Sequence, residues 1–331
     1  MSARRVGLTY NLRETFPRRE GQPSDADGDW DVPETVHRLL EGLRNCGCSV
    51  LDVGDPRHLA NADVRGQIEL VFNICEMVGF RSREGLVPSL CEVLNLPYLL
   101  SPPDTLMISL DKNLCNYLVR QAGAPVPDWH VVHSLDHLRL LGPKCFDFPC
   151  LVKPVAEGSG MGIDADSVAL CPETLQVAVA RVIENYRQPA LVQAWLEGRE
   201  FTIGLLERGK AVTALKALEI RPRQQPEHFV YGFATKERAD ALVDFVPLDE
   251  PELERGLADI AVIAFRAIGC RDGARVDLRL SGRRPYFLEI NPLPHFHPDV
   301  GDFCRSARAA GLEYSDLLAR LVENGATRWG L

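Results

Sequence analysis

The chain lacks the features that mark secreted, membrane-spanning and nucleic-acid-binding proteins. None of its apolar runs reaches the ~18 residues that a membrane span needs. The first residues include Arg4 and Arg5 but no apolar core, so we expect no signal peptide. The formal net charge is −9, which argues against nucleic acid or an anionic membrane as the main partner. We therefore expect a cytoplasmic protein with neither kind of partner.

The chain also lacks a cysteine pattern typical of metal sites or disulfide frameworks. Ten cysteines are present, but no C-x-x-C occurs, and Cys46 and Cys48 are separated by one residue only. The cysteines are scattered through apolar runs, where a reduced thiol acts as a small core residue. We expect neither zinc nor disulfides.

What the chain does contain is an ordinary globular composition with alternating strand and helix patterns. Of its 331 residues, 46% are hydrophobic and 25% are charged, which allows more than one domain. Apolar runs predict strands at 4–10, 48–54 and 68–75, with an amphipathic helix between the first two, from Pro33 to about Gly47. The charged segment 11–30, rich in Gly, Pro and Asp, is predicted to be a mobile loop. This alternation predicts a parallel, helix-covered sheet.

Further along the chain, helices and short strands are predicted in a different order. A helix is expected from about Thr105 to Ala122, after a Pro pair that opens a linker. From Phe148 onward the pattern is strand, Gly-rich turn, helix and then consecutive strands joined by turns. A helix at 251–268, a hairpin and a last helix at 314–324 complete the prediction.

A Gly-rich stretch follows a predicted strand that ends near Lys153. Three glycines and a serine occupy five positions, 158–162, so backbone N–H groups of this loop can face an anion. The lysine precedes the glycines and no G-K-[ST] follows, so this is neither a P-loop nor a dinucleotide fingerprint. A flexible hairpin tip is the competing interpretation, and this stretch alone does not decide between them.

A second stretch, 193–200, predicts a strand end followed by Glu200 at a turn. Backbone N–H and C=O groups along such an edge can bind an adenine, and a carboxylate can hold ribose hydroxyls. A surface hairpin with a solvated glutamate explains this stretch equally simply, and on its own we would prefer that interpretation.

The hairpin between Arg275 and Asn291 carries a polar stripe that an ordinary hairpin does not need. Because residues two apart in a strand share a face, the sequence predicts two polar rows. These rows are Arg275, Asp277 and Arg279 on one strand and Phe287, Glu289 and Asn291 on the other. Carboxylate and carboxamide oxygens are suitable ligands for Mg²⁺, especially beside phosphates. A solvent-facing pair of strands with ion pairs is the alternative.

Taken together, these stretches resemble the ATP-grasp superfamily, and most closely its D-alanine–D-alanine ligase group. The motifs that carry the resemblance are "LVFNICE", "SREGLVPSL", "SLDKNLCNYLV", "VKPVAEGSGMGI", "LEGREFTIGLL", "RVDLRL" and "YFLEINPLP". They occur in the family's order and cover almost the whole chain.

The resemblance implies an α/β fold in three parts: an N-terminal parallel α/β domain, followed by an ATP-grasp domain of the α+β type that consists of two subdomains. Residues 1–104 would form a parallel α/β domain, 105–190 a small central subdomain, and 191–331 a C-terminal subdomain with the Mg²⁺ site. ATP would lie between the last two parts. Because dimers are usual in the family, the resemblance also implies a homodimer.

The resemblance also implies roles for individual residues. The positions that match the family's nucleotide-binding residues are Lys112, Lys153, Glu157, Gly158, Ser159, Gly160, Gln193, Ala194, Trp195, Leu196, Glu200 and Lys236. Those that match its Mg²⁺ ligands are Asp277, Glu289 and Asn291, for two Mg²⁺ ions, with Mn²⁺ as an alternative. Candidate catalytic positions are Arg275, which would stabilise an oxyanion, together with Ser159 and Lys236.

Departures from the family pattern are confined to the substrate side. His295 replaces a glycine, and Gly301 stands where a serine is expected. His295 would add bulk and a base, or would only pack, and His297 is expected to be a packed loop residue. Glu237 follows Lys236 where a tyrosine is usual, and the glutamate that holds the first ammonium is not evident, although Glu14 could replace it.

These observations predict an ATP-dependent ligase that joins a small-molecule carboxylate to an amine through an acyl phosphate. We expect amino-acid substrates, and an acceptor other than D-alanine, in small-molecule biosynthesis. The alternatives are a genuine D-alanine–D-alanine ligase of cell-wall synthesis, an intramolecular cyclo-ligase that uses the same acyl phosphate, and a non-catalytic nucleotide-binding protein.

Overall fold

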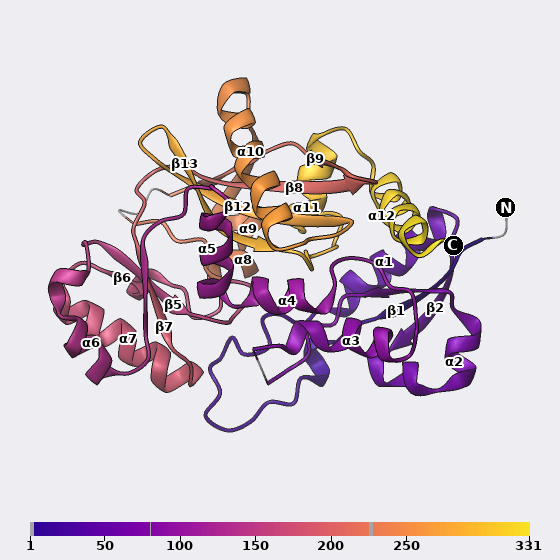
Figure 1. Ribbon diagram of the computed structural model, residues 1–331, viewed down its shortest axis with the longest axis horizontal. Coiled ribbons are helices and arrows are strands. Elements are labelled where there is room, and N and C mark those ends of the chain that lie inside the picture. The colour runs from indigo at the N-terminus through magenta and orange to yellow at the C-terminus, as the bar shows by residue number, and fades with distance from the viewer. Residues whose placement is uncertain (1–2, 80, 225–227) are drawn as a thin grey trace.

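The computed structural model describes residues 3–79, 81–224 and 228–331. Three sheets lie along the long axis of the molecule, with helices packed on them, and both termini lie at the same end (Figure 1). None of the helices in these described stretches has the length and apolar character needed to cross a membrane.

The N-terminal sheet is parallel, as the alternating pattern predicted. Its strands β1 (Arg5–Thr9), β2 (Ser49–Gly54) and β3 (Leu70–Asn73) lie in the order β2-β1-β3. The helices in this part are α1 (Pro33–Asn45), α2 (Ala62–Gln67) and α3 (Leu86–Val93). The apolar face of α1 shares a buried core with the C-terminal helix α12 (Tyr314–Trp329), so the two ends of the chain are packed together.

The central sheet is antiparallel and has four strands. These are β4 (Trp129–Val132), β5 (Cys150–Pro154), β6 (Val168–Ala169) and β7 (Ala190–Ala194), in the order β4-β7-β5-β6. The helices α6 (Leu135–Leu141) and α7 (Pro172–Tyr186) pack on it through a separate apolar core. Strand β7 begins at Ala190 and belongs to this sheet along its whole length.

The third sheet has six strands, and it carries the Arg275–Asn291 hairpin. Its order is β11-β10-β8-β12-β13, with β9 paired to β8. The strands are β8 (Glu200–Arg208), β9 (Ala211–Ala214), β10 (Leu218–Pro222), β11 (Val243–Pro247), β12 (Gly273–Ser281) and β13 (Arg284–Asn291). Its helices are α10 (Pro251–Ala267) and α11 (Asp302–Ala309), while the short helices α8 (Phe233–Glu237) and α9 (Ala239–Leu242) lie in the connection between β10 and β11.

The single helix predicted at 105–122 is wrong, because two helices occupy this segment. They are α4 (Pro103–Leu110) and α5 (Lys112–Gln121), separated by Asp111 in an extended conformation. The Asp111 carboxylate accepts hydrogen bonds from the N–H groups of Asn113 (3.1 Å) and Leu114 (3.2 Å) and so caps α5. The break places Lys112 at the first turn of α5, where its own N–H donates to the Val155 carbonyl.

The polar row predicted on β13 is also partly wrong, because a β-bulge interrupts the pairing with β12. Asp277 pairs with Glu289, but the next residue, Leu278, pairs with Phe287, which leaves Leu288 as the extra residue. Phe287 therefore faces the apolar core and is fully buried. Glu289 and Leu288 both line the cavity beside the sheet.

The loop after β1 is irregular, as predicted, but its tip is bound to the central sheet region. The Asp25 carboxylate accepts hydrogen bonds from the Gly162 N–H (2.9 Å) and from the Tyr186 hydroxyl. Trp30 donates its indole N–H to the Met77 carbonyl (3.0 Å). The N-terminal part of the chain thus contacts the Gly-rich turn after β5.

Candidate active site

Two cavities meet where the Gly-rich turn, the β12–β13 hairpin and the segment after β10 converge. The smaller, of about 60 Å³, is lined by residues of the central and C-terminal sheets. The larger, of about 660 Å³, extends from the hairpin towards the N-terminal part of the chain. Tyr231 and Lys236 line both, so one segment borders the two spaces.

The smaller cavity brings together most of the residues assigned to nucleotide binding. Its lining residues include Lys153, Gly160, Gln193, Ala194, Trp195, Leu196, Glu200, Lys236, Asp277 and Glu289. The Arg279 guanidinium lies over the Trp195 ring (4.3 Å) and 3.3 Å from the Glu200 carboxylate. Burial raises the pKa of Glu200 to about 7, against the opposing effect of Arg279.

Four cationic side chains surround Glu289 at the boundary of the two cavities. Its carboxylate oxygens lie 3.7 Å from Lys112 Nζ, 3.9 Å from Lys236 Nζ and 3.6 Å from Arg275 Nη2. Burial alone would raise the pKa of Glu289, but these cations and Lys153 lower it well below its usual range. Glu289 is therefore ionised at neutral pH.

The same concentration of positive charge acts on Lys153. Burial lowers its pKa to about 8, and Lys112 and Lys236 act in the same direction, while Glu289 opposes them. A phosphate group in this place would compensate the excess positive charge.

The hairpin strand β12 holds Asp277 and Arg275 in a buried ion pair. Asp277 accepts from the Thr202 hydroxyl (2.7 Å) and from Arg275 Nη2 (2.9 Å). Arg275 Nη1 also lies 3.9 Å from the Asp302 carboxylate. Arg275 Nε is buried and, among the described residues, has no hydrogen-bond partner, so the hydrogen-bonding capacity of this guanidinium donor is unused.

The oxygens of Asp277, Glu289 and Asn291 fit a hard divalent cation. Asp277 and Glu289 are directly paired across β12 and β13, and Asn291 pairs with Arg275 at the end of the hairpin. Among the described residues, the Asn291 carboxamide oxygen accepts only from the Leu293 N–H (3.1 Å), which leaves lone-pair capacity for a metal. The donor set is all oxygen, as Mg²⁺ and Mn²⁺ require.

The Gly-rich turn closes against the segment that contains Tyr231 and Lys236. Ser159 and Gly160 have positive φ values, of 49° and 73°. The Gly160 carbonyl accepts from the Phe233 N–H (3.0 Å), and a Cβ at Gly160 would lie 2.9 Å from the Gly232 carbonyl carbon. This close approach therefore requires glycine. Ser159 lines the larger cavity.

The Glu157 side chain points away from both cavities. It binds Arg83 (3.1 Å) and Gln188 (2.6 Å), while its backbone carbonyl accepts from Lys112 Nζ. Of the residues assigned to the nucleotide, Glu157 is thus the one whose carboxylate is engaged in the wall of the site.

The segment 228–242 is tied to the N-terminal part of the chain by an ion pair. Glu237, which stands where the family has a tyrosine, lies 2.8 Å from the Arg13 guanidinium. Tyr231, six positions earlier, lies under the Lys236 ammonium (5.2 Å), and its hydroxyl donates to Asp302 (3.5 Å). The segment therefore covers both cavities from one side.

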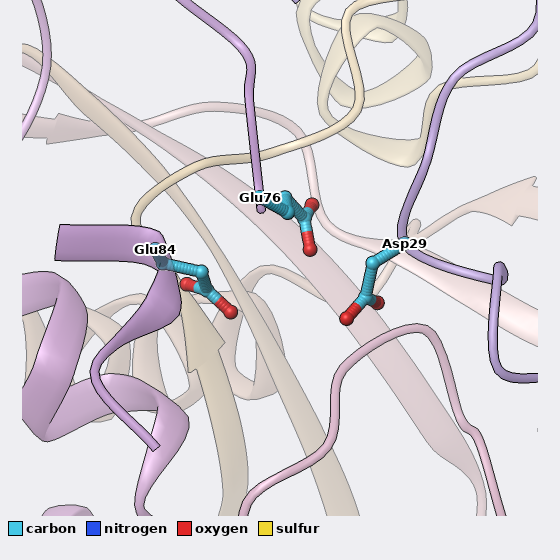
Figure 2. A group of neighbouring side chains, drawn as sticks. All are labelled: Asp29, Glu76 and Glu84. Carbon is cyan, nitrogen blue, oxygen red and sulfur yellow. The ribbon is translucent and has the colours of Figure 1, made fainter. Parts of the chain in front are cut away.

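A group of carboxylates to which the motifs assigned no role lies at the N-terminal side of the larger cavity, and two of them, Asp29 and Glu76, line it. Asp29, Glu76 and Glu84 come from three separate segments, and their side chains point toward one another (Figure 2). Arg83 compensates part of this charge through Asp29 (2.6 Å). Glu14, considered as the ammonium-binding residue, is exposed and lines neither cavity.

The crowding of these carboxylates predicts a pH-dependent stability that one substitution should reveal. Burial raises the pKa of Glu84 to about 7, although Arg83 opposes the shift. A carboxyl whose pKa is raised on folding stabilises the protein below about pH 4.5, and this contribution is lost as the pH rises through 7. Glu84→Gln should therefore raise the free energy of unfolding by about 1–3 kcal/mol at pH 8 relative to its effect at pH 5.

Denaturation of the wild type and the variant at both pH values measures this difference. Glu323→Gln, on the exposed side of α12, is the control and should show no pH-dependent change. An equal effect of Glu84→Gln at pH 5 and pH 8 would contradict the assignment.

The two histidines after the hairpin differ in their surroundings. His295 lines the larger cavity and has 42% of its side chain exposed, with Nε2 lying 3.3 Å from both Asp31 Oδ1 and Thr35 Oγ1. His297 is buried, and its Nδ1 accepts from the N–H groups of Asp299 and Val300 (3.2 and 3.3 Å). His297 thus shapes its own loop.

The structure also explains why a glycine, and not the serine of the family pattern, occupies position 301. A Cβ at this position would overlap the carbonyl oxygens of His295 and His297, so the serine of the family pattern does not fit this loop.

The chain is similar to known ligases in both sequence and fold. Residues 118–323 match the family model described as D-ala D-ala ligase C-terminus. A D-alanine–D-alanine ligase of Thermotoga sp. (strain RQ2) is 30% identical over 298 residues, which cover 90% of this chain and 92% of that protein. An uncharacterized protein of Sinorhizobium fredii is also 30% identical, over 94% of this chain and 93% of its own length.

Two solved structures show the same fold at lower sequence identity. The D-alanine–D-alanine ligase of Bacillus anthracis has a TM-score of 0.75 at 22% identity, covering 98% of both chains. The D-Ala:D-Ser ligase of Enterococcus faecalis has a TM-score of 0.75 at 14% identity, covering 98% of this chain and all of that one. The fold class and the resemblance inferred from the motifs are confirmed.

Proposed function

The chain belongs to the D-alanine–D-alanine ligase family and is an ATP-dependent carboxylate–amine ligase, and on this premise we propose how its residues divide the reaction and which substrates it takes. The single observation that carries the substrate proposal is the wall formed by His295 and Asp31, where the family pattern has a glycine. The reaction we propose joins two amino-acid-like molecules of which at least the acceptor is not D-alanine.

ATP would occupy the smaller cavity. Gln193 to Leu196 would contact the adenine, and Glu200 would hold the ribose hydroxyls. The buried Gln193 Nε2 has no partner within the described residues, which supports contact with a polar ligand there. Lys112, Lys153 and Lys236 would bind the phosphates, since they supply the excess positive charge around Glu289.

Asp277, Glu289 and Asn291 would hold Mg²⁺, with Mn²⁺ as an alternative. When bound, the metal would neutralise phosphate charge during phosphoryl transfer. The low pKa of Glu289 supports this role, because a metal ligand of this type must be ionised.

The chemistry follows from the charges that line the two cavities. The carboxylate substrate attacks the γ-phosphorus, ADP leaves, and an acyl phosphate forms. The amine then attacks the acyl carbon, and inorganic phosphate leaves. Arg275 would stabilise the oxyanion of the tetrahedral intermediate through its unpartnered Nε. Ser159 and Lys236, on the Gly-rich turn and the covering segment, would position the reacting groups and exclude water.

The size of the larger cavity supports substrates other than two small amino acids. At about 660 Å³ it falls within the range of about 300–1,000 Å³ that encloses drug-sized ligands. We place this reaction in small-molecule biosynthesis. By analogy with the family we also propose a cytoplasmic homodimer, which light scattering on the purified protein tests for its oligomeric state.

An ADP-release screen tests the proposed function. Purified protein with ATP and Mg²⁺ is supplied with D-alanine, D-serine and the twenty protein amino acids, singly and in pairs, and products are identified by mass spectrometry. We expect ADP and a dipeptide from a pair other than two D-alanines. D-alanyl-D-alanine as the best product would instead identify a cell-wall ligase.

Two further outcomes of the screen would point to a different activity. A product that has lost water from one substrate would indicate a cyclo-ligase. ATP binding without ADP release for any pair or for larger amino-carboxylates would indicate a non-catalytic nucleotide-binding protein.

A further inference from the structure

His295 contacts Asp31 and Thr35, and all three residues line the larger cavity. Its Nε2 lies 3.3 Å from Asp31 Oδ1 and 3.3 Å from Thr35 Oγ1. Asp31 is fixed by its backbone, since its carbonyl accepts from the Arg13 N–H and its N–H donates to the Asn11 carbonyl. Thr35 is buried in the first turn of α1. The imidazole is therefore oriented by groups that cannot move freely.

This orientation determines which imidazole nitrogen can act as a base. A carboxylate beside Nε2 favours the tautomer in which Nε2 carries the proton and faces Asp31. Nδ1 then holds the lone pair, and it has no hydrogen-bond partner in the parts of the chain that the structure describes. An imidazole whose second nitrogen is held by a carboxylate is the arrangement that supports general-base catalysis.

His295 lies in the same cavity as residues of the proposed acyl-transfer site. The larger cavity that it lines is also lined by Arg275 and Asn291. His297 is engaged with its own loop, so it does not compete for this role. The other charged groups around the ring are Glu34 and Asp299, which contact His297 and Arg38.

We propose that His295 is the general base for the amine substrate, with Asp31 and Thr35 as positioning residues. The proposal rests on the function proposed above and adds the group that makes the amine reactive. An amine bound as an ammonium cannot attack a carbonyl until it has lost a proton.

Protons and charge balance across the proposed step. Nδ1 of His295 takes one proton from the ammonium, and Asp31 stabilises the resulting imidazolium. The free amine attacks the acyl carbon, the C–N bond forms, and the bond between the acyl carbon and the phosphate oxygen breaks. The second proton of the amine leaves with the phosphate as HPO₄²⁻, and His295 releases its proton to solvent.

Hydroxylamine distinguishes a loss of amine deprotonation from a loss of acyl-phosphate formation. It is unprotonated at neutral pH, so it traps an acyl phosphate as a hydroxamate without help from a base. The test compares hydroxamate formation with dipeptide formation, using the most active pair of the amino-acid panel above. The variant is His295→Asn, which keeps a polar side chain but removes the base.

We expect His295→Asn to form the hydroxamate at a rate close to that of the wild type. Dipeptide formation at pH 7 should fall by about 10²–10⁴-fold, and the loss should shrink as the pH approaches the pKa of the free amine. Asp31→Asn should give a smaller loss in the same direction, with the acidic limb of the kcat/KM profile shifted.

His297→Asn is the matched control, since asparagine can still accept the two loop N–H groups. Its ratio of dipeptide to hydroxamate should equal that of the wild type. A parallel loss of both products in His295→Asn, or no loss of dipeptide, would overturn the base assignment. Absence of hydroxamate in the wild type would instead reject the acyl phosphate, and with it the proposed function.

Discussion

Glu289→Gln is expected to abolish turnover while leaving ATP binding in place. The substitution removes an anion on which Lys112, Lys153, Lys236 and Arg275 all act. An amide oxygen is neutral and a weaker ligand than a carboxylate, so the site should lose affinity for the divalent cation, which in bound form contributes several kcal/mol of charge stabilisation to phosphoryl transfer. We therefore expect ADP release to fall by roughly 10³-fold or more.

The charge balance predicts that nucleotide affinity survives this change. Without Glu289 the cationic group is more positive, and it still attracts the phosphates of ATP. ADP release as a function of Mg²⁺ concentration measures the loss of turnover, and calorimetry measures the affinity for ATP.

Two further variants complete this test. Asp277→Asn should behave like Glu289→Gln, since both carboxylates are paired across the same two strands. Glu254→Gln, whose carboxylate binds Lys216 away from both cavities, is the control for a lost ion pair. Normal turnover with an unchanged Mg²⁺ requirement in Glu289→Gln would show that Glu289 is not a metal ligand.

The parts of the fold that the sequence predicts well are those set by local patterns. The parallel sheet followed from apolar runs that alternate with an amphipathic helix, and β1, β2 and β3 occupy those runs. The polar face of Arg275, Asp277 and Glu289 followed from the two-residue period of a strand, and these three side chains do meet. Motif order then predicted the family without knowledge of the fold.

The errors arise where one residue changes the local geometry. Period-two alternation cannot reveal the extra residue at Leu288, so Phe287 was placed on the wrong face of β13. The break at Asp111 could have been predicted, because an aspartate before a helical run is a common N-cap signal. Helical periodicity on both sides of Asp111 concealed it.

The residues that the sequence could not supply are those joined by tertiary contacts. Glu76 and Glu84 each lie in a motif that carried the resemblance, but no spacing rule connects them with each other or with Asp29. Asp31 and His295 are likewise far apart along the chain, yet their side chains are in contact. The segment after β1 could be predicted as irregular from its composition. Its place in the wall of the site could not be predicted, because it depends on the contact of Asp25 with the Gly-rich turn, which is far away along the chain.

Arg275→Lys is expected to slow bond formation strongly while keeping the fold and the affinity for ATP. Arg275 is buried between Asp277, Glu289 and Asp302, so removal of its charge would leave buried carboxylates uncompensated. Lysine retains that charge but cannot present a second donor in the direction of Nε, the nitrogen that has no partner among the described residues. Loss of one oxyanion donor lowers kcat by about 10²–10³-fold.

A matched variant on the same face of β12 distinguishes a role in oxyanion stabilisation from a role in nucleotide binding. Arg279 lies over Trp195 and binds Glu200 in the smaller cavity, so Arg279→Lys should raise the KM for ATP more than it lowers kcat. Thermal denaturation of both variants checks that the fold is intact. If Arg275→Lys changed only the KM for ATP, Arg275 would belong to the nucleotide site, and the tetrahedral intermediate would have to be stabilised by another donor.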